Sequence, residues 1–130
     1  MVKLRQSGED YLETILILSK KGEVRSIDIA NEMNVSKPSV CRAVGILKSG
    51  GFIEVNQNGY IIFTAEGKAA AEKIYERHTV LTDWLVGIGV DENTAEKDAC
   101  RLEHNFSPES FEKLKNHIIM FHTEKSAEHK

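Results

Sequence analysis

The chain has 130 residues, of which 41% are hydrophobic and 28% are charged, and its net charge is −3. This composition is typical of a soluble globular domain, and no apolar run approaches the ~20 residues that a bilayer-spanning helix needs. Because the first five residues also lack the apolar core of a signal peptide, we expect a cytoplasmic protein without a membrane partner. The two cysteines, Cys41 and Cys100, are too few for a disulfide framework and can serve as thiols or ligands.

Charge is distributed unevenly along the chain. Residues 1–63 hold 8 Lys and Arg against 7 Asp and Glu, whereas residues 64–130 hold 9 against 13, together with all five histidines. The segment 33–53 contains no acidic residue but does contain three cations. This asymmetry indicates two functions, and we expect a DNA-binding domain at 1–63 and a second domain at 64–130.

Three helices are predicted at the start of the chain, from apolar residues that recur at helical spacing. The first covers about 7–19, the second 27–33 and the third about 37–48. Ser26 and Ser36 are the expected N-caps of the second and third helices, because a serine hydroxyl accepts hydrogen bonds from the first free amides of a helix.

A β-hairpin is predicted next. Two apolar segments, 52–55 and 60–63, flank a polar tetrapeptide in which Asn58 and Gly59 are expected to take the positive φ values of a tight turn. Three helices followed by a hairpin is the element order of a winged helix-turn-helix, and the short turn between the second and third helices fits that motif.

In a winged helix-turn-helix the third helix enters the major groove of DNA and presents its non-apolar side to the bases. The expected contacts are Ser39 and Arg42 with bases or phosphates, Lys37 and Lys48 with phosphates, and Asn56 and Asn58 at the hairpin tip with the DNA backbone or minor groove. The same topology can serve only for packing or protein contacts, but the acid-free segment favours DNA. Since one winged helix buries little surface, we expect a homodimer that reads two half-sites of double-stranded DNA.

The second half is predicted to be entirely helical. Thr64 caps a long helix over 65–86, a second helix covers about 92–105, and Ser107-Pro108 begins a last helix with a frayed polar tail from residue 123. The expected fold class is therefore mainly α with a small β-hairpin: an N-terminal winged helix-turn-helix followed by an all-helical lobe for dimerisation and metal binding.

One pentapeptide in this half, Cys100-Arg101-Leu102-Glu103-His104, has the composition of a metal site. On a helix, positions 100, 103 and 104 share one face, so a thiol, a carboxylate and an imidazole converge there. These three groups are good donors for one divalent transition metal. Taken alone, such a pentapeptide is more often an ordinary solvated helix face that carries a glutamate and a histidine beside a half-buried cysteine.

Motifs in both halves of the chain point to one family. They are Glu9-Asp10-Tyr11-Leu12-Glu13-Thr14-Ile15, Val35-Ser36-Lys37-Pro38-Ser39-Val40, Thr64-Ala65-Glu66-Gly67, Arg77-His78, and the pentapeptide followed by Asn105-Phe106-Ser107. With these motifs in this order, the chain resembles the diphtheria toxin repressor/manganese transport regulator family of metal-dependent transcriptional regulators, in a short form without an SH3-like domain. The resemblance implies a homodimeric repressor of metal-uptake genes in which a divalent cation couples the two lobes and permits operator binding.

The resemblance also implies the metal ligands. They are Asp10 and Glu13 from the first helix, His78 from the long helix, and Cys100, Glu103 and His104 from the pentapeptide. Glu96 is a further candidate, because it occupies a position that iron-type members use, with the position of His78, for a second metal site. Another position of that second site is Thr82 in this chain, so the second site is either absent or rebuilt with Glu96.

The residues leave the identity of the metal open. Asp10 and Glu13 resemble the manganese-type members of the family, whereas Cys100 resembles the iron-type members. Carboxylates suit Mn²⁺, while a thiolate and an imidazole favour Fe²⁺, Co²⁺ or Zn²⁺. We expect Mn²⁺ or Fe²⁺ in the cell, with Zn²⁺ or Co²⁺ able to bind in vitro.

Three alternative functions are compatible with parts of this sequence pattern. The first is a metal-independent winged-helix regulator whose second half serves only for dimerisation. The second is a metallohydrolase built on the 100–104 cluster, and the third is an intracellular metal buffer. A hydrolase needs a substrate cleft and an open metal position, and a buffer leaves the cationic third helix unexplained. We therefore expect neither an enzyme nor a protein with a small organic substrate.

Overall fold

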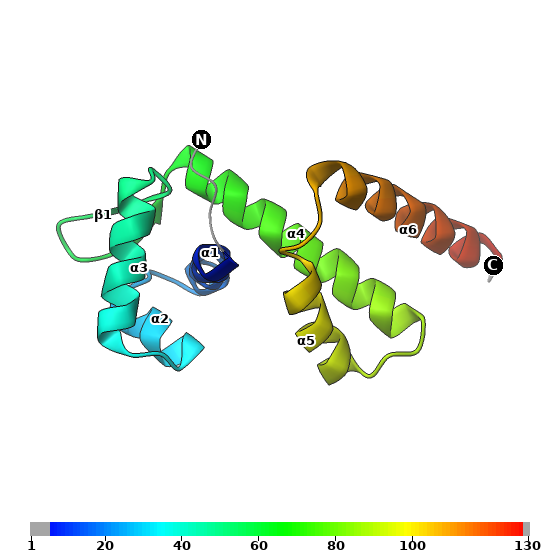
Figure 1. The fold of residues 1–130 in the computed structure, drawn as a ribbon, viewed down its shortest axis with the longest axis horizontal. Coiled ribbons are helices and arrows are strands. Elements are labelled where there is room, and N and C mark those ends of the chain that lie inside the picture. Colours follow the sequence, from blue (N-terminus) through cyan, green and yellow to red (C-terminus); the bar gives the residue numbers. More distant parts are fainter. Residues whose placement is uncertain (1–5, 129–130) are drawn as a thin grey trace. The chain divides into compact units, whose positions relative to one another are not determined.

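The computed structural model describes the backbone of residues 6–128 and the side chains of residues 7–120 (Figure 1). The elements in this part of the chain are α1 (Gln6–Ser19), α2 (Ser26–Met33), α3 (Lys37–Ser49), β1 (Ile53–Val55), β2 (Ile61–Phe63), α4 (Ala65–Gly87), α5 (Glu92–Leu102) and α6 (Pro108–Glu128). They confirm the predicted fold class. None of the described helices is both long and apolar enough to cross a membrane.

The chain divides into two compact units, Met1–Tyr75 (unit 1) and Glu76–Lys130 (unit 2), and α4 contributes residues to both. Each unit has its own hydrophobic core. The predicted division into domains at 63/64 stays a prediction.

Unit 1 is held together by a core between its three helices and its hairpin. Leu12 and Ile15 of α1 are fully buried, as are the apolar residues that face them from α2, α3 and β1: Ile29, Val40, Leu47 and Ile53. Burial of a side chain of this size stabilises the folded state by about 1.5–3 kcal/mol. The core fixes α3 against α1 and α2 and leaves the opposite side of α3 in solvent.

The start of α2 differs from the prediction, whereas the start of α3 confirms it. Arg25, not Ser26, is the N-cap of α2, and its backbone N–H donates to Asp28 Oδ2 over 2.9 Å. The Asp28 carboxylate, three residues after the N-cap, thus binds the start of the helix in place of the predicted Ser26 hydroxyl. Ser36 caps α3 as predicted, since its hydroxyl accepts from the Ser39 N–H over 3.3 Å. Asn34 ends α2 with a φ of 54°.

The hairpin pairs β1 with β2 in antiparallel register, with Ile53 opposite Phe63. Gly59 has the predicted positive φ, at 81°. Asn58 does not have a positive φ, contrary to the prediction; among the described non-glycine residues only Asn34 has one. The Asn56 side chain holds the turn instead: its Oδ1 accepts from the backbone N–H groups of Asn58 and Tyr60 over 2.9 and 3.0 Å. A side chain that accepts two backbone donors stabilises the tip without a second left-handed residue.

The junction between the hairpin and α4 depends on a capping threonine and a close-packed glycine. Thr64 caps α4 as predicted: its hydroxyl accepts from the Gly67 N–H over 3.0 Å and lies 2.6 Å from the Gly51 carbonyl, to which it donates. A Cβ at position 67 would lie 1.7 Å from the Phe52 carbonyl oxygen. Glycine at this position therefore lets the first turn of α4 pack directly on the backbone after α3.

Unit 2 has a smaller core of Leu81, Ala99 and Phe111, against which the half-buried Trp84 and Leu114 pack. Two predicted boundaries in this unit were wrong. Helix α5 ends at Leu102 rather than near residue 105, and α6 continues to Glu128 although a frayed tail was expected from residue 123. Four of the six residues from 123 to 128, namely Glu124, Lys125, Ala127 and Glu128, are of types with high helix propensity.

Candidate metal centre and DNA-binding surface

A cluster of metal-ligating groups lies at the C-terminal end of α5. Cys100 is in the last turn of the helix, Glu103 is its C-cap residue, and His104 follows in the turn. Each of the three places one donor atom within 4.8 Å of the donor atoms of the other two. Although α5 ends before Glu103, that residue keeps helical dihedral angles (φ −59°, ψ −25°), so the predicted convergence is retained over the helix end.

Glu103 is the centre of this cluster, and its side chain is fully buried. His78 of α4 lies with Nδ1 at 2.9 Å from Oε2 of Glu103. The other oxygen, Oε1, has no hydrogen-bond partner among the described residues, and His104 Nε2 lies 3.2 Å from it. A buried carboxylate without full compensation costs several kcal/mol, which a bound cation would offset.

The chemistry of these donors fits a divalent transition metal. Thiolate, imidazole and carboxylate are the side chains that bind such ions, and one carboxylate oxygen of Glu103 lies within 4.8 Å of the Cys100 sulfur and of a His104 imidazole nitrogen. His78, Cys100, Glu103 and His104 are thus the residues of unit 2 that could hold the ion.

The two ligand candidates of unit 1 lie on α1. Asp10 and Glu13 are three residues apart, so their side chains share one face of that helix, and both are half-buried. Glu96 is exposed, one turn before Cys100 on α5, and is not among the donors that cluster with Cys100 in the described part of the chain. All seven metal-ligand assignments remain predictions.

The predicted DNA contacts lie on α3 and on the hairpin tip. Lys37, Arg42 and Lys48 are exposed along α3, with no acidic residue between them. Ser39 is half-buried, and its hydroxyl lies 2.8 Å from that of Ser36, so it belongs to the cap of α3 as well as to the candidate surface. A Ser-x-x-Ser pattern at a helix start is the signal for such a cap.

At the hairpin, Asn56 and Asn58 are both exposed, but the Asn56 carbonyl oxygen is already engaged by the turn. The structure adds an arginine that sequence analysis missed. Arg25 is exposed, donates from Nη2 to the Tyr60 hydroxyl over 3.1 Å, and lies 4.7 Å from the centre of the Tyr60 ring. It brings a cation to the turn end of the hairpin, beside the residue that pairs with Asn56, and no sequence pattern connects residues 35 positions apart.

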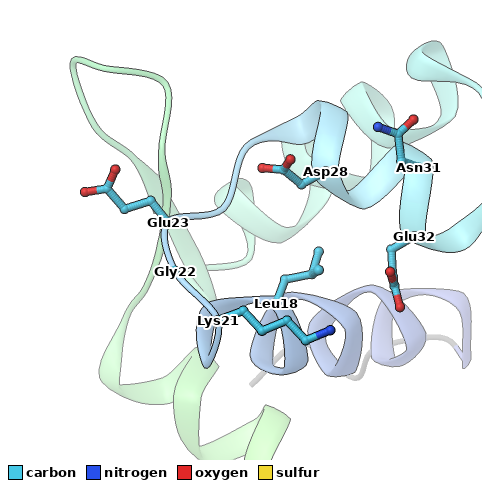
Figure 2. A pocket seen from close by; sticks show the side chains of 7 residues that line it. All are labelled: Leu18, Lys21, Gly22, Glu23, Asp28, Asn31 and Glu32. Carbon is cyan, nitrogen blue, oxygen red and sulfur yellow. The ribbon is translucent and has the colours of Figure 1, made fainter.

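An open hollow of about 360 Å³ lies between the end of α1 and α2 (Figure 2). Three carboxylates, those of Glu23, Asp28 and Glu32, line it together with a single cation, Lys21. Such a negative surface repels phosphates, so this part of unit 1 is unsuited to face DNA. Among the described residues of unit 1, the cations of α3 lie on a helix without carboxylates, which is better suited to attract phosphates.

A winged helix with a cationic third helix, in one chain with a buried carboxylate beside a half-buried thiol and an imidazole, defines a metal-responsive DNA-binding protein. Family comparisons agree with this class. The family described as "Iron dependent repressor, N-terminal DNA binding domain" matches residues 3–61, and "Iron dependent repressor, metal binding and dimerisation domain" matches residues 64–126. The chain belongs to this family of metal-dependent transcriptional regulators, as its motifs had indicated.

Individual relatives support the same assignment. The transcriptional regulator MntR of Escherichia coli is 34% identical over 109 residues, which are 83% of this chain and 70% of that protein. An HTH-type transcriptional regulator of Methanocaldococcus jannaschii is 33% identical over 115 residues, or 86% of this chain and 92% of that protein. The solved structure of the manganese regulator SloR has a TM-score of 0.77 and 26% identity over 85% of this chain. This chain covers 53% of the SloR chain, about half its length.

Proposed function

We propose that the protein is a homodimeric transcriptional repressor of metal-uptake genes, which binds its DNA operator when it holds a divalent transition metal. The observation that carries this proposal is the buried Glu103 carboxylate, with one oxygen unsatisfied, among the donors Cys100 and His104. A winged helix with cations along α3 gives the second half of the function. This role takes place in the cytoplasm, where the DNA is, and it requires neither a substrate cleft nor a catalytic step.

The proposed ligands of the metal are His78, Cys100, Glu103 and His104 from unit 2, with Asp10 and Glu13 from unit 1. The bound ion supplies positive charge to the buried carboxylate and a fixed coordination geometry to the side chains around it. We assign Mn²⁺ or Fe²⁺ as the physiological ion, because the donor set combines carboxylates with a thiol and imidazoles. Zn²⁺ and Co²⁺ are expected to bind in vitro, in line with their higher intrinsic affinity for nitrogen and sulfur ligands.

DNA binding is assigned to α3 and the hairpin. Lys37, Arg42 and Lys48 would contact phosphates and base edges of the major groove, with Ser39, Asn56 and Asn58 as further contacts. Two copies of this surface in a dimer read two half-sites, which supplies the area that specific binding requires.

Coupling between metal and DNA follows from the origin of the ligands. Because the proposed set draws on both units, a bound metal favours the arrangement of the units that satisfies all the ligands. If this arrangement is also the one that fits two half-sites, metal shifts the population toward the DNA-binding state. A coupling free energy of about 1–3 kcal/mol would tighten operator binding by roughly 5–150-fold.

A DNA titration tests the proposal. A pool of random-sequence duplexes is first enriched for binders in the presence of Mn²⁺, and fluorescence anisotropy then gives the affinity for the selected duplex with Mn²⁺ and with EDTA. We expect EDTA to weaken binding by the fold-change given above. Equal affinity in Mn²⁺ and EDTA would refute metal dependence and would favour a metal-independent winged-helix regulator with a second half that only dimerises.

A further inference from the structure

Two adjacent residues of α4 bind opposite parts of Glu103. His78 contacts the carboxylate, with Nδ1 at 2.9 Å from Oε2, while Arg77 donates from Nη1 to the Glu103 backbone carbonyl over 3.1 Å. The same Nη1 of Arg77 also donates to the carbonyl of Phe106 over 3.0 Å. One turn of α4 thus holds both the side chain and the main chain of the central ligand candidate.

The carbonyls that Arg77 binds lie where α5 has ended. The last carbonyls of a helix lack intrahelical partners, and Glu103 is the C-cap residue of α5. Arg77 satisfies the Glu103 carbonyl and links it to that of Phe106, so one guanidinium spans the turn that carries His104. Hydrogen bonds from a charged donor are roughly twice as strong as neutral ones, so this clamp is stronger than an amide contact.

The Arg77 guanidinium is itself held in place. It lies 5.2 Å from the ring centre of Phe111, a core residue of unit 2 that is 5% exposed. The rings of Phe111 and Phe106 meet edge to face, with centres 6.3 Å apart. The arginine therefore connects the ligand-bearing turn to the hydrophobic core of the unit.

We propose that Arg77 is a positioning residue for the metal centre. By holding the turn 103–106, it keeps the donor atoms of Glu103 and His104 close to that of Cys100 before the metal arrives, and this preorganisation raises metal affinity. Arg77 touches the main chain, not the metal donors, so it acts through Glu103 and His104. This role rests on the proposed function, because it presumes that the cluster binds a metal.

The planar guanidinium is essential to this role. Arginine offers donors at fixed angles and stacks on an aromatic ring, whereas the lysine ammonium is a compact point charge on a flexible stem. Lysine would retain the positive charge but not both the two-carbonyl contact and the ring contact. Arg77→Lys should thus keep the electrostatics of the site and lose much of its geometry.

The test compares Mn²⁺ affinity, measured by electron paramagnetic resonance of the free ion on folded protein at 25 °C, with thermal unfolding of the metal-free protein. We expect Arg77→Met to weaken Mn²⁺ binding by about 10–100-fold, the range typical for residues that orient metal ligands. Arg77→Lys should fall between Arg77→Met and the wild type. A residue that only stabilised the fold would lower the unfolding temperature and leave the affinity of the folded protein unchanged.

Lys115→Met is the matched control. Lys115 lies in the same unit and its Nζ is 2.6 Å from Glu76 Oε1, a hydrogen bond that raises the pKa of the Lys115 ammonium and keeps it charged. Its replacement removes one positive charge that pairs with Glu76, the residue before Arg77, without touching the turn 103–106. Mn²⁺ affinity should therefore stay within about twofold, well below the effect expected at Arg77.

The outcomes separate the two proposals. Wild-type affinity for Mn²⁺ in folded Arg77→Met would refute the positioning role and leave the metal site in place. If Arg77→Met does not fold, wild-type affinity in Arg77→Lys refutes the role instead. A wild-type protein that binds no Mn²⁺, Fe²⁺, Co²⁺ or Zn²⁺ would refute the proposed function itself.

Discussion

The Glu103 carboxylate is unfavourable for the stability of the metal-free fold but suited to binding a metal cation. Its side chain is fully buried, and one of its two oxygens has no hydrogen bond in the described part of the chain. Evolution toward stability alone would favour an apolar or neutral residue here, because replacing a buried charge often stabilises a fold. A carboxylate at this position is explained by a cation that compensates it.

Glu103→Gln should therefore separate stability from metal binding. The amide keeps the size of the side chain and can still accept a hydrogen bond from His78, but it removes the negative charge. We expect the metal-free protein to unfold at the same or a higher temperature, while Mn²⁺ affinity falls by at least about 10–100-fold. Calorimetric titration and thermal unfolding measure the two effects.

Glu112→Gln on α6 is the control for this variant, because Glu112 is exposed and lies outside the cluster. Its Mn²⁺ affinity should match that of the wild type. A Glu103→Gln protein that binds Mn²⁺ as tightly as Glu112→Gln would remove Glu103 from the ligand set.

Cys100→Ala is the corresponding test of the sulfur donor. Alanine fits a half-buried helix position, and its high helix propensity preserves α5. We expect the loss of a thiolate to weaken Zn²⁺ and Co²⁺, which prefer sulfur, more than Mn²⁺, which prefers oxygen. Equal losses for all three ions in parallel titrations would contradict direct ligation by Cys100.

At the scale of elements, two helical glycines differ in whether the packing of the fold requires a residue without a side chain. Gly67 lies in the first turn of α4, where a Cβ would overlap the Phe52 carbonyl. Gly45 lies in the middle of α3 and is exposed, with nothing within 4 Å of the position that a Cβ would take. Packing requires the first glycine, while the fold of unit 1 does not require the second.

Gly67→Ala is expected to destabilise the protein. The added methyl meets backbone rather than a flexible side chain, so either α4 or the segment after α3 must shift. Overpacking of this kind costs about 1–3 kcal/mol, and the overlap at this site places the effect at the upper end or beyond. The midpoint of urea unfolding, with an unchanged slope, reports this loss.

Gly45→Ala should act in the other direction. Alanine restricts the unfolded chain and favours helix, and its methyl meets no neighbour in α3, so we expect a gain of about 0.5–1 kcal/mol. The same urea titration measures it. A loss of stability at position 45, or none at position 67, would contradict the packing described for these helices.

The order of the elements could be predicted from local patterns, because each depends on its own residues. Apolar spacing gave the helices, Ser36 and Thr64 marked their starts, and Gly59 marked the hairpin turn. The end of α5 could not be predicted in this way. It falls at Leu102, and the residue after it is bound by Arg77 and His78 of another helix, contacts across 26 and 25 residues that no local signal reports.

The candidate site shows the same limit. Spacing predicted that Cys100, Glu103 and His104 would converge, and their donor atoms do. The burial of Glu103 and the clamp by Arg77 depend on the packing of α4 against α5 and α6. This packing cannot be predicted from local sequence patterns. Likewise, Ser39 was predicted as a DNA contact, and the 2.8 Å distance between its hydroxyl and that of Ser36 shows that it also belongs to the cap of α3.

At the scale of the whole molecule, the central claim is that metal binding and DNA binding are coupled. Coupling between two sites is reciprocal, so a metal that tightens DNA binding by a given factor must itself bind more tightly by that factor when DNA is present. Reciprocity of this kind requires that the metal change the affinity for DNA. A metal that stabilises unit 2 without changing the affinity for DNA does not produce it.

The most direct measurement is the Mn²⁺ affinity of the full-length protein with and without a saturating amount of the selected duplex, under one salt condition. We predict that the duplex tightens Mn²⁺ binding by the same factor, roughly 5–150-fold, by which Mn²⁺ tightens DNA binding. A duplex of equal length that the protein does not select should have a smaller effect. Identical Mn²⁺ affinity with and without the selected duplex would contradict the account.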